Sequence, residues 1–197
     1  MAGKFIVIYG INNIGKTTQA KLLKERMDKE GFLTEYIKYP RYELKPAGEL
    51  INNYLREGNE YNFSPREFQL LHYIDRVSYE PILKEKLKQE INIVAEDYFG
   101  TGLAWGIGSG VNKELLESFY NSLHKEDIAI LLEGKRFHNC REETHKHECN
   151  DELLDKVSLI HSQLADKHGW IKVKANRSVE EVHDEIWEIV SKLIYDL

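Results

Sequence analysis

Short apolar runs alternate along the chain with longer stretches in which apolar residues recur at helical spacing. The apolar runs predict five strands, at residues 5–9, 34–38, 91–95, 128–132 and 170–173. The stretches between them are long enough for the crossover helices that parallel strands require. The alternation therefore predicts an α/β fold of three layers, with a five-stranded parallel sheet between helices on both faces. No repeat or linker interrupts the pattern, so we expect a single domain over residues 1–197.

Two of the expected helices have a recognisable start. Ser64 is followed by Pro65 and, three positions after the serine, by Glu67. A serine at the N-cap, a proline in the first turn and a glutamate at the third position are typical of a capped helix. Ser178 and the glutamate three positions after it repeat the capping spacing before a final amphipathic stretch. Both positions predict the beginning of a helix.

Residues 134–150 lack apolar periodicity and are rich in charge and histidine. A charged, non-periodic stretch between two core elements is typical of an exposed loop or a mobile lid, and we expect a lid here. Its side chains that could bind zinc are His138, Cys140, His145, His147 and Cys149. Structural zinc sites usually include closely spaced pairs such as C-x-x-C, which this stretch lacks. A polar lid that faces water or nucleotide phosphates is the alternative, and the one we favour.

The composition is that of an ordinary globular protein, with 42% hydrophobic and 30% charged residues. The 27 Lys and Arg against 33 Asp and Glu give a formal net charge of -6, so no net basic field exists to hold a nucleic acid. The longest apolar runs fall far short of the roughly 20 residues that a membrane span needs. The 2 cysteines cannot form a disulfide framework. We therefore expect a cytoplasmic protein that binds neither nucleic acid nor membrane.

The strongest motif follows the first predicted strand. Residues 10–17, GINNIGKT, match G-x-x-x-x-G-K-[ST] in full, between a buried strand and an expected helix. Gly10 and Gly15 let the backbone turn tightly and aim its N–H groups at phosphate oxygens, and the helix adds its positive N-terminal end. Lys16 is expected to reach the β- and γ-phosphates, and the Thr17 hydroxyl to bind Mg²⁺. The motif predicts a nucleoside triphosphate site but does not fix the reaction.

A GTP-dependent switch protein is one alternative for this motif. Residues 97–100, DYFG, imitate the D-x-x-G of such proteins. Guanine recognition also requires N-K-x-D at a strand end. Residues 112–115, NKEL, lack the aspartate and follow no predicted strand. The sequence therefore disfavours a GTP switch.

Polar side chains further along the chain indicate a second nucleotide-sized site. The second predicted strand is followed by Tyr39, Pro40 and Arg41. This position places a cation at the carboxyl edge of the sheet, where ligands of such folds bind. Gln69, His72 and Arg76 fall on one face of an expected helix, so a ring lies one turn from a guanidinium. Such a pair can stack on a base and hydrogen-bond its edge. A solvated polar stripe is the alternative reading of this spacing.

From the P-loop onward the sequence resembles the eukaryotic-type thymidylate kinases, a family of P-loop nucleoside monophosphate kinases. The similarity covers nearly the whole chain, and its pieces come in the family's order. They are residues 10–19, 39–41, 48–55, 70–76, 81–87, 96–105 and 174–186. No piece after the P-loop is diagnostic alone, but their order and spacing together are fairly specific.

The resemblance implies transfer of the ATP γ-phosphoryl group to the 5′-phosphate of dTMP, giving dTDP for dTTP synthesis. It implies that Arg41 holds the dTMP phosphate, that Arg76 reads thymine O4 and that His72 stacks on the base. Tyr98 and Trp105 are expected to line the sugar, with Trp105 excluding a ribose 2′-hydroxyl. The implied acceptor-binding residues are Asn12, Tyr39, Pro40, Arg41, Gln69, His72, Arg76, Asp97, Tyr98, Thr101, Gly102 and Trp105.

The resemblance also implies a donor site and a set of catalytic groups. The residues implied to bind ATP are Gly10, Asn13, Gly15, Lys16, Thr17, Thr18, Ala175, Asn176 and Arg177, with adenine against the last three. Mg²⁺ is expected at Thr17 and Glu96. The implied catalytic residues are Lys16, Arg41, Glu96 and the two lid arginines Arg136 and Arg141. Because the family packs through helices, we expect a homodimer whose small-molecule partners are ATP and dTMP.

Several residues depart from the family pattern. Asn12 stands where the family usually has an aspartate that contacts the sugar 3′-hydroxyl, and Asn13 where eukaryotic members often have an arginine. Either Arg136 or Arg141 of the lid is expected to supply the missing cation. His72 replaces the usual phenylalanine, so it can hydrogen-bond as well as stack.

The most consequential departure is Glu96-Asp97 in place of the family's Asp-Arg pair. Glu96 can keep the carboxylate on the Mg²⁺ side, whereas Asp97 puts an anion where the family has a cation facing both phosphates. Unless Asp97 points away, or binds metal while Glu96 turns aside, it should weaken acceptor binding. The alternatives to a dTMP kinase are therefore another deoxynucleotide or nucleoside kinase and a catalytically weak nucleotide-binding homologue.

Overall fold

The computed structural model describes residues 2–137 and 151–195 of the chain. Its centre is a five-stranded parallel sheet with the strand order β2-β3-β1-β4-β5. The strands are β1 (Phe5–Tyr9), β2 (Thr34–Lys38), β3 (Asn92–Glu96), β4 (Ile128–Glu133) and β5 (Ile171–Lys174). Each lies within one residue of the range that the apolar runs predict, so the predicted strands and their parallel pairing are confirmed.

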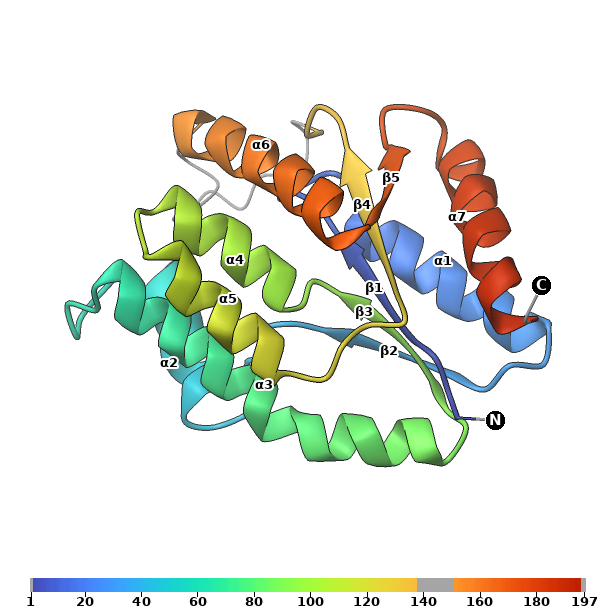
Figure 1. The fold of residues 1–197 in the computed structure, drawn as a ribbon, viewed down its shortest axis with the longest axis horizontal. Coiled ribbons are helices and arrows are strands. Elements are labelled where there is room, and N and C mark those ends of the chain that lie inside the picture. The colour runs from blue at the N-terminus through green and yellow to red at the C-terminus, as the bar shows by residue number, and fades with distance from the viewer. Residues whose placement is uncertain (1, 138–150, 196–197) are drawn as a thin grey trace.

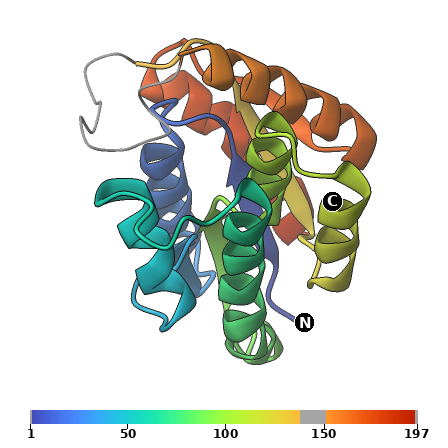
Figure 2. The ribbon, with the colours of Figure 1, turned by 90° about the vertical axis from the view of Figure 1, so that its left-hand side faces the viewer.

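Helices cover both faces of the sheet. They are α1 (Lys16–Lys29), α2 (Ala47–Arg56), α3 (Pro65–Lys88), α4 (Phe99–Gly108), α5 (Lys113–Ser122), α6 (Asp151–His168) and α7 (Val179–Ile194). α1 and α7 pack together on one face, and α3, α4 and α6 lie on the other (Figure 1). α2 packs against α3, as the perpendicular view shows, and α5 packs against α4 (Figure 2). The predicted three-layer α/β sandwich is confirmed.

The central strands are covered from both sides. Every residue of β1 and of β3 is buried. Strands buried on both faces are nearly continuous apolar runs, which is why these segments stand out in the sequence. A second, smaller apolar cluster of Ile51, Tyr54, Leu55 and Phe68 joins α2 to α3. Among the described residues, no helix combines the length and apolar character needed to cross a lipid bilayer.

Both predicted helix starts are confirmed as reciprocal capping boxes. At α3, the Glu67 backbone N–H donates to Ser64 Oγ at 3.3 Å, and the Ser64 N–H donates to Glu67 Oε2 at 2.8 Å. At α7, the Ser178 and Glu181 pair repeats this arrangement at 3.2 and 3.0 Å. Each box satisfies backbone donors that have no partner inside the helix.

The carboxyl ends of three neighbouring strands meet at one edge of the sheet. The strand register pairs Lys38 at the end of β2 with Glu96 at the end of β3. It also pairs Glu96 with Ile8 of β1, just before the P-loop. Loops that leave the carboxyl ends of parallel strands therefore bring side chains from distant parts of the sequence to one place.

Candidate active site

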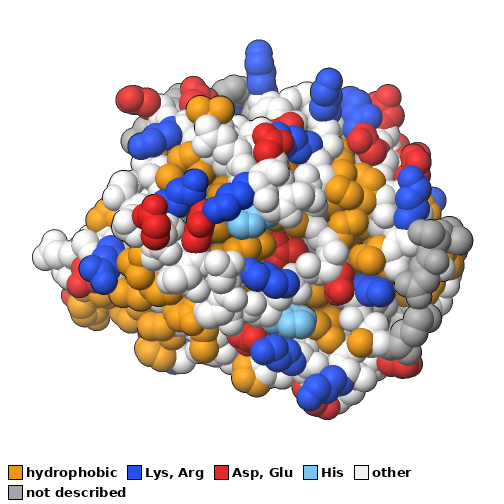
Figure 3. Space-filling view, viewed as in Figure 1, with side chains coloured by type: hydrophobic (Ala, Val, Ile, Leu, Met, Phe, Trp, Pro, Cys, Tyr) orange, Lys and Arg blue, Asp and Glu red, His pale blue; other side chains and the backbone are white. Residues whose placement is uncertain are grey.

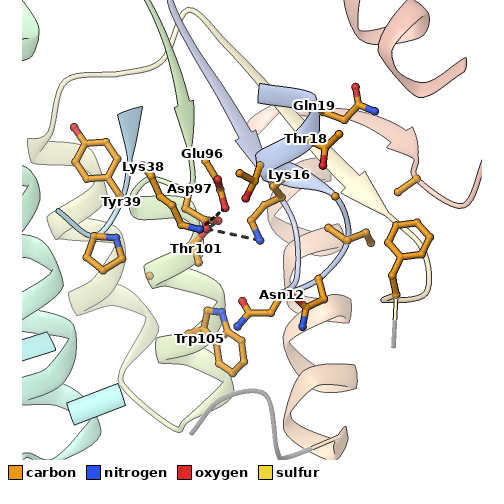
Figure 4. Close-up of a pocket in the computed structure, with 18 of the residues that line it drawn as sticks. Asn12, Lys16, Thr18, Gln19, Lys38, Tyr39, Glu96, Asp97, Thr101 and Trp105 are labelled. Atoms are coloured by element: carbon orange, nitrogen blue, oxygen red, sulfur yellow. Dashed lines mark hydrogen bonds and ion pairs between the residues drawn. The ribbon is translucent and has the colours of Figure 1, made fainter. Parts of the chain in front are cut away.

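A cavity of about 810 Å³ opens at this edge of the sheet. Its lining comes from the P-loop, the ends of β2 and β3, α2, α3 and α4, and the loop between β5 and α7 (Figure 4). Predicted site residues in the lining are Asn12, Asn13, Gly15, Lys16, Thr17, Thr18, Tyr39, Pro40, Gln69, His72, Arg76, Glu96, Asp97, Thr101, Gly102, Trp105, Ala175 and Arg177. One cavity therefore holds most of the residues expected on the donor side and most of those expected on the acceptor side.

The P-loop leads directly into α1, which begins at Lys16. Gly15 takes the N-cap position with a φ of 96°, in the left-handed region that favours glycine. Lys16 Nζ curls back over the loop and donates to the carbonyl oxygens of Gly10 at 3.0 Å and Ile11 at 2.9 Å. Gly10 does not line the cavity. A Cβ there would lie 3.1 Å from the Leu132 carbonyl oxygen, so this glycine is needed for close packing of the loop on β4.

Asp97 faces the P-loop lysine. Its Oδ2 lies 3.7 Å from Lys16 Nζ, and its Oδ1 accepts a 2.6 Å hydrogen bond from the Thr101 hydroxyl. Burial raises the pKa of the Asp97 carboxyl, an effect that the charge of Lys16 opposes and that of Glu96 reinforces. The anion that stands where the family has a cation is thus held against the P-loop lysine.

Glu96 lies beside Asp97 and is bonded to residues of β2. Its Oε2 accepts a 2.6 Å hydrogen bond from the Tyr36 hydroxyl, and its Oε1 lies 2.9 Å from Lys38 Nζ. Burial acts to raise the pKa of Glu96, but the charges of Lys16 and Lys38 hold that pKa below its usual value. The two adjacent carboxylates therefore have different partners, Glu96 on β2 and Asp97 on the P-loop.

The base-reading residues expected on α3 lie together at the far end of the cavity. Arg76 is only 1% exposed and is held by Asp75 Oδ2 at 3.2 Å and by His72 Nδ1 at 2.9 Å. Arg76 also donates to the Tyr98 carbonyl at 3.4 Å. In the described part of the chain, Gln69 Oε1 and Arg76 Nε are buried without a hydrogen-bond partner. Buried polar atoms are nearly always paired, so these two lining groups suit a polar ligand.

Two residues expected to bind the acceptor do not line the cavity. The Arg41 side chain forms an ion pair with Glu43 at 2.6 Å and lies over the Tyr79 ring, 4.3 Å from its centroid. Tyr98 is a core residue: its hydroxyl donates to the His124 carbonyl at 3.1 Å, and its ring packs edge-on against Phe5. In this structure neither side chain contributes to the cavity lining.

Asn176, which is expected to bind ATP, lies outside the cavity lining. Its Oδ1 accepts from the Lys135 N–H at 2.6 Å, and its Nδ2 donates to the Lys135 carbonyl at 2.8 Å. A Cβ at Gly134 would lie 2.1 Å from Asn176 Oδ1. The asparagine thus ties the loop after β5 to the segment that follows β4.

The expected lid is described only at its beginning. Phe137 lines the cavity, and its N–H donates to the Asn13 carbonyl at 2.8 Å. Arg136 is part-buried and outside the lining. Arg141 and the five candidate zinc ligands lie outside the described residues. Residues 2–137 and 151–195 hold no group of three or more His, Cys, Asp or Glu side chains that could bind a metal ion.

Several lining residues were not predicted from the sequence. They are Ile14, Gln19, Lys38, Tyr42, Leu55, Arg56, Phe137, Val179 and Val182. Ile14, Gln19, Leu55, Val179 and Val182 fall within segments that resemble the family, and a further signal in the sequence came from Lys38. It is a cation at the carboxyl end of a predicted strand, directly before Tyr39.

Comparisons with known proteins identify the family of this chain. A family model for thymidylate kinase matches residues 8–186. A probable thymidylate kinase of Methanocaldococcus jannaschii is 31% identical over 186 residues, covering 92% of this chain and 93% of its own. The thymidylate kinase of Plasmodium falciparum is 27% identical over 194 residues, covering 97% and 91%.

A solved structure has a similar fold. The thymidylate kinase of Candida albicans superposes with a TM-score of 0.80, at 23% identity, over 97% of this chain and 92% of that one. At this level of identity the likeness supports the fold. The family assignment comes from the family model, which spans nearly the whole chain and includes both the P-loop and the α3 residues. The chain therefore belongs to the thymidylate kinase family, the phosphotransferases that convert dTMP to dTDP.

Proposed function

We propose that the protein transfers the γ-phosphoryl group of ATP to the 5′-phosphate of dTMP within this single cavity. The observation that carries the proposal is the continuity of the lining from the P-loop to the α3 residues. An oxygen of the dTMP phosphate attacks the γ-phosphorus while the bond to the β-phosphate oxygen breaks, giving dTDP and ADP. The acceptor is mostly dianionic at neutral pH because its second pKa lies near 6, so it needs no strong base. Catalysis then rests on positioning and on reducing repulsion between two anions.

The donor triphosphate is placed along the P-loop. Lys16 and the N–H groups at the start of α1 would hold its phosphates, together with Thr17 and Thr18. Adenine would lie against Ala175 and Arg177, at the end of the cavity away from α3. Arg177 is fixed there by an ion pair with Glu185.

Mg²⁺ fits the oxygen donors between the two nucleotide sites. The Thr17 hydroxyl and the carboxylates of Glu96 and Asp97 all line the cavity, and hydroxyl and carboxylate oxygens are ligands that this ion prefers. When bound, the ion supplies positive charge to the transferring phosphoryl group. The protein's part is to hold the carboxylates rigidly, which it does through the Tyr36 and Thr101 hydroxyls.

The acceptor nucleoside is placed between α3 and α4. The buried Gln69 Oε1 and Arg76 Nε, both without partners in the described chain, would read the edge of the base, and His72 would stack on it. Thr101, Gly102 and Trp105 form the opposite wall, where the sugar would lie. Asn12 reaches the same space from the P-loop and would hydrogen-bond the sugar 3′-hydroxyl.

A panel of acceptors tests this function. The protein is incubated with ATP, Mg²⁺ and each of dTMP, dUMP, dCMP and dGMP, and ADP release is followed. We expect turnover with dTMP well above that with the others, and none for Lys16→Ala, whose fold should be intact. A preference for another monophosphate would identify a shifted acceptor. ATP binding without ADP release for any acceptor would identify a non-catalytic homologue.

We also propose that the enzyme is a homodimer that packs through α3. Ile74, Val77 and Ile82 of this helix are 43%, 41% and 46% exposed, which is unusual for large apolar side chains on one helix. Hydrophobic side chains gather on the face over α3 and α5 (Figure 3). Light scattering after size exclusion tests the proposal: a monomer mass at micromolar concentration would contradict it, and Val77→Glu should dissociate a dimer.

We propose the cytoplasm as the place of action, because the reaction consumes ATP and yields a precursor of DNA synthesis. Small-molecule nucleotides are then its partners. Cell fractionation with an antibody against the protein tests this location. Recovery with a membrane or organelle fraction would contradict it.

A further inference from the structure

We propose that Lys38 binds the phosphate of the acceptor nucleotide, taking the place of the family cation that Asp97 removes. The inference rests on the proposed function and assigns a specificity-determining contact within it. It follows from where Lys38 lies, from the partners of the other cations in the cavity, and from the way Glu96 holds it.

Lys38 lies at the point where the two nucleotide sites meet. It is the last residue of β2 and is in register with Glu96 at the end of β3. Its side chain lines the cavity and is 49% exposed, so a ligand can reach the ammonium group. Lys38 and Lys16 extend toward each other, with the carboxylates of Glu96 and Asp97 between them (Figure 4). A phosphate beside Lys38 would therefore face a phosphate held by Lys16.

The other lysine and arginine side chains of the lining have hydrogen-bond or ion-pair partners in other parts of the cavity. Lys16 is bound to two P-loop carbonyls and to Asp97, on the donor side. Arg76 is buried beside Asp75 at the base end, and Arg177 pairs with Glu185 at the adenine end. Arg56 donates to Asn52 at 2.8 Å.

Arg41, the residue expected to hold this phosphate, is outside the lining and paired with Glu43. Lys38 is thus the cation whose position and exposure suit the acceptor phosphate. Within the described residues its one hydrogen-bonding or ion-pair partner is Glu96, at 2.9 Å. An ammonium group has three N–H donors, so two remain for phosphate oxygens.

Glu96 acts as a positioning residue for this lysine. It is buried, and the Tyr36 hydroxyl fixes one of its oxygens while Lys38 takes the other. A fixed carboxylate beside the ammonium keeps it charged and limits its rotation. The charge of Lys38 then opposes the repulsion between the attacking oxygen and the transferring phosphoryl group, with no proton transfer by the lysine.

The experiment compares binding of dTMP with binding of thymidine, which lacks the phosphate. Affinities are measured by calorimetry for the wild type, Lys38→Met, Lys38→Arg and the control Lys45→Met. Lys45 is 76% exposed, pairs with Glu49 and is not in the lining. We expect Lys38→Met to weaken dTMP binding at least tenfold while thymidine binding stays within twofold. Lys38→Arg should keep most of the dTMP affinity, and Lys45→Met should match the wild type.

Steady-state kinetics adds a second readout. Lys38→Met should raise the KM for dTMP and leave the KM for ATP unchanged. If Lys38→Met leaves the ratio of dTMP affinity to thymidine affinity unchanged, whether neither affinity falls or both fall equally, the proposal is overturned. If the acceptor panel shows another preferred monophosphate, that nucleotide and its nucleoside replace dTMP and thymidine. Failure of the dTMP assignment and failure of the Lys38 assignment are therefore separate outcomes.

Discussion

Asp97 Oδ2 lies 3.7 Å from Lys16 Nζ, so the P-loop lysine of this enzyme has a buried carboxylate beside it. The main chain at Asp97 has a φ of 61°, in the left-handed region that non-glycine residues rarely adopt. The other carboxylate oxygen of Asp97, Oδ1, accepts a hydrogen bond from the Thr101 hydroxyl at 2.6 Å. The anion at this position is thus compensated locally by the P-loop lysine and by Thr101.

The first prediction concerns the charge of residue 97. Asp97→Arg should lose activity, although it restores the residue type of the family, because it would place a second cation beside Lys16 in a buried site. Removing one partner of a buried ion pair costs on the order of 3–5 kcal/mol, and adding a like charge costs more. We expect kcat to fall at least a hundredfold and the urea midpoint of unfolding to fall.

Asp97→Asn provides the milder comparison. It keeps the Thr101 hydrogen bond and removes only the charge, so kcat should fall by about tenfold and the fold should persist. Asp184→Asn makes the same chemical change at a carboxylate that is 74% exposed and pairs with Arg26, and should leave kcat unchanged. A higher kcat in Asp97→Arg would contradict the prediction and show that the native aspartate slows the reaction.

The second prediction concerns the pH dependence of stability. Burial on α6, with a smaller effect from the charge of Lys16, lowers the pKa of His161 from 6.5 to about 3. In the unfolded chain this histidine binds a proton below its ordinary pKa, whereas in the folded protein it stays neutral to about pH 3. Stability from this residue is therefore fully present above pH 6.5 and is lost as the pH falls. At pH 5 the loss should be about 2 kcal/mol relative to pH 7.5.

Urea unfolding of the wild type and of His161→Leu at pH 7.5, 6 and 5 measures this effect. The stability of the leucine variant at pH 7.5 does not bear on the prediction, because only the change in the free energy of unfolding with pH matters. Between pH 7.5 and pH 5, the free energy of unfolding of His161→Leu should fall by about 2 kcal/mol less than that of the wild type. Parallel pH profiles for the two proteins would show that His161 does not titrate as expected.

The third prediction concerns the asparagine that joins the two loops beside the adenine end. Asn176→Ala removes both hydrogen bonds to the Lys135 backbone and should lower the free energy of unfolding by about 1 kcal/mol. It should raise the KM for ATP several-fold and leave the KM for dTMP unchanged. Asn176→Asp keeps the acceptor and loses the donor, so its ATP KM should lie between those of the wild type and the alanine variant. Equal effects on both substrates would contradict a local role.

The elements of the fold were predictable because their signals are local. Buried parallel strands are short apolar runs, and the capping serines act on backbone groups only three residues away. The P-loop is recognisable from a short motif, since its glycines permit a tight turn that other residues would not adopt. These features need no knowledge of the rest of the molecule.

The side-chain directions in the site were less predictable, because they depend on neighbours distant in sequence. Arg41 follows a strand end as expected, yet Glu43 and Tyr79 draw it away from the cavity. Lys38 ends a predicted strand, but the sequence alone does not say which strand lies beside it. Its place beside Glu96 follows only from the strand order β2-β3-β1.

The last prediction distinguishes the roles of Arg41 and Arg76, the two arginines expected to bind the acceptor. Arg41→Ala should leave the KM for dTMP within twofold of the wild type, since its guanidinium is outside the cavity lining. Arg76→Lys keeps the charge beside Asp75 but loses the planar fork, so the KM for dTMP should rise at least tenfold with the KM for ATP unchanged. ATP binding confirms that each variant is folded. A large rise in the dTMP KM for Arg41→Ala would mean that this arginine leaves Glu43 to bind the phosphate, in which case Lys38 and Arg41 would share the acceptor.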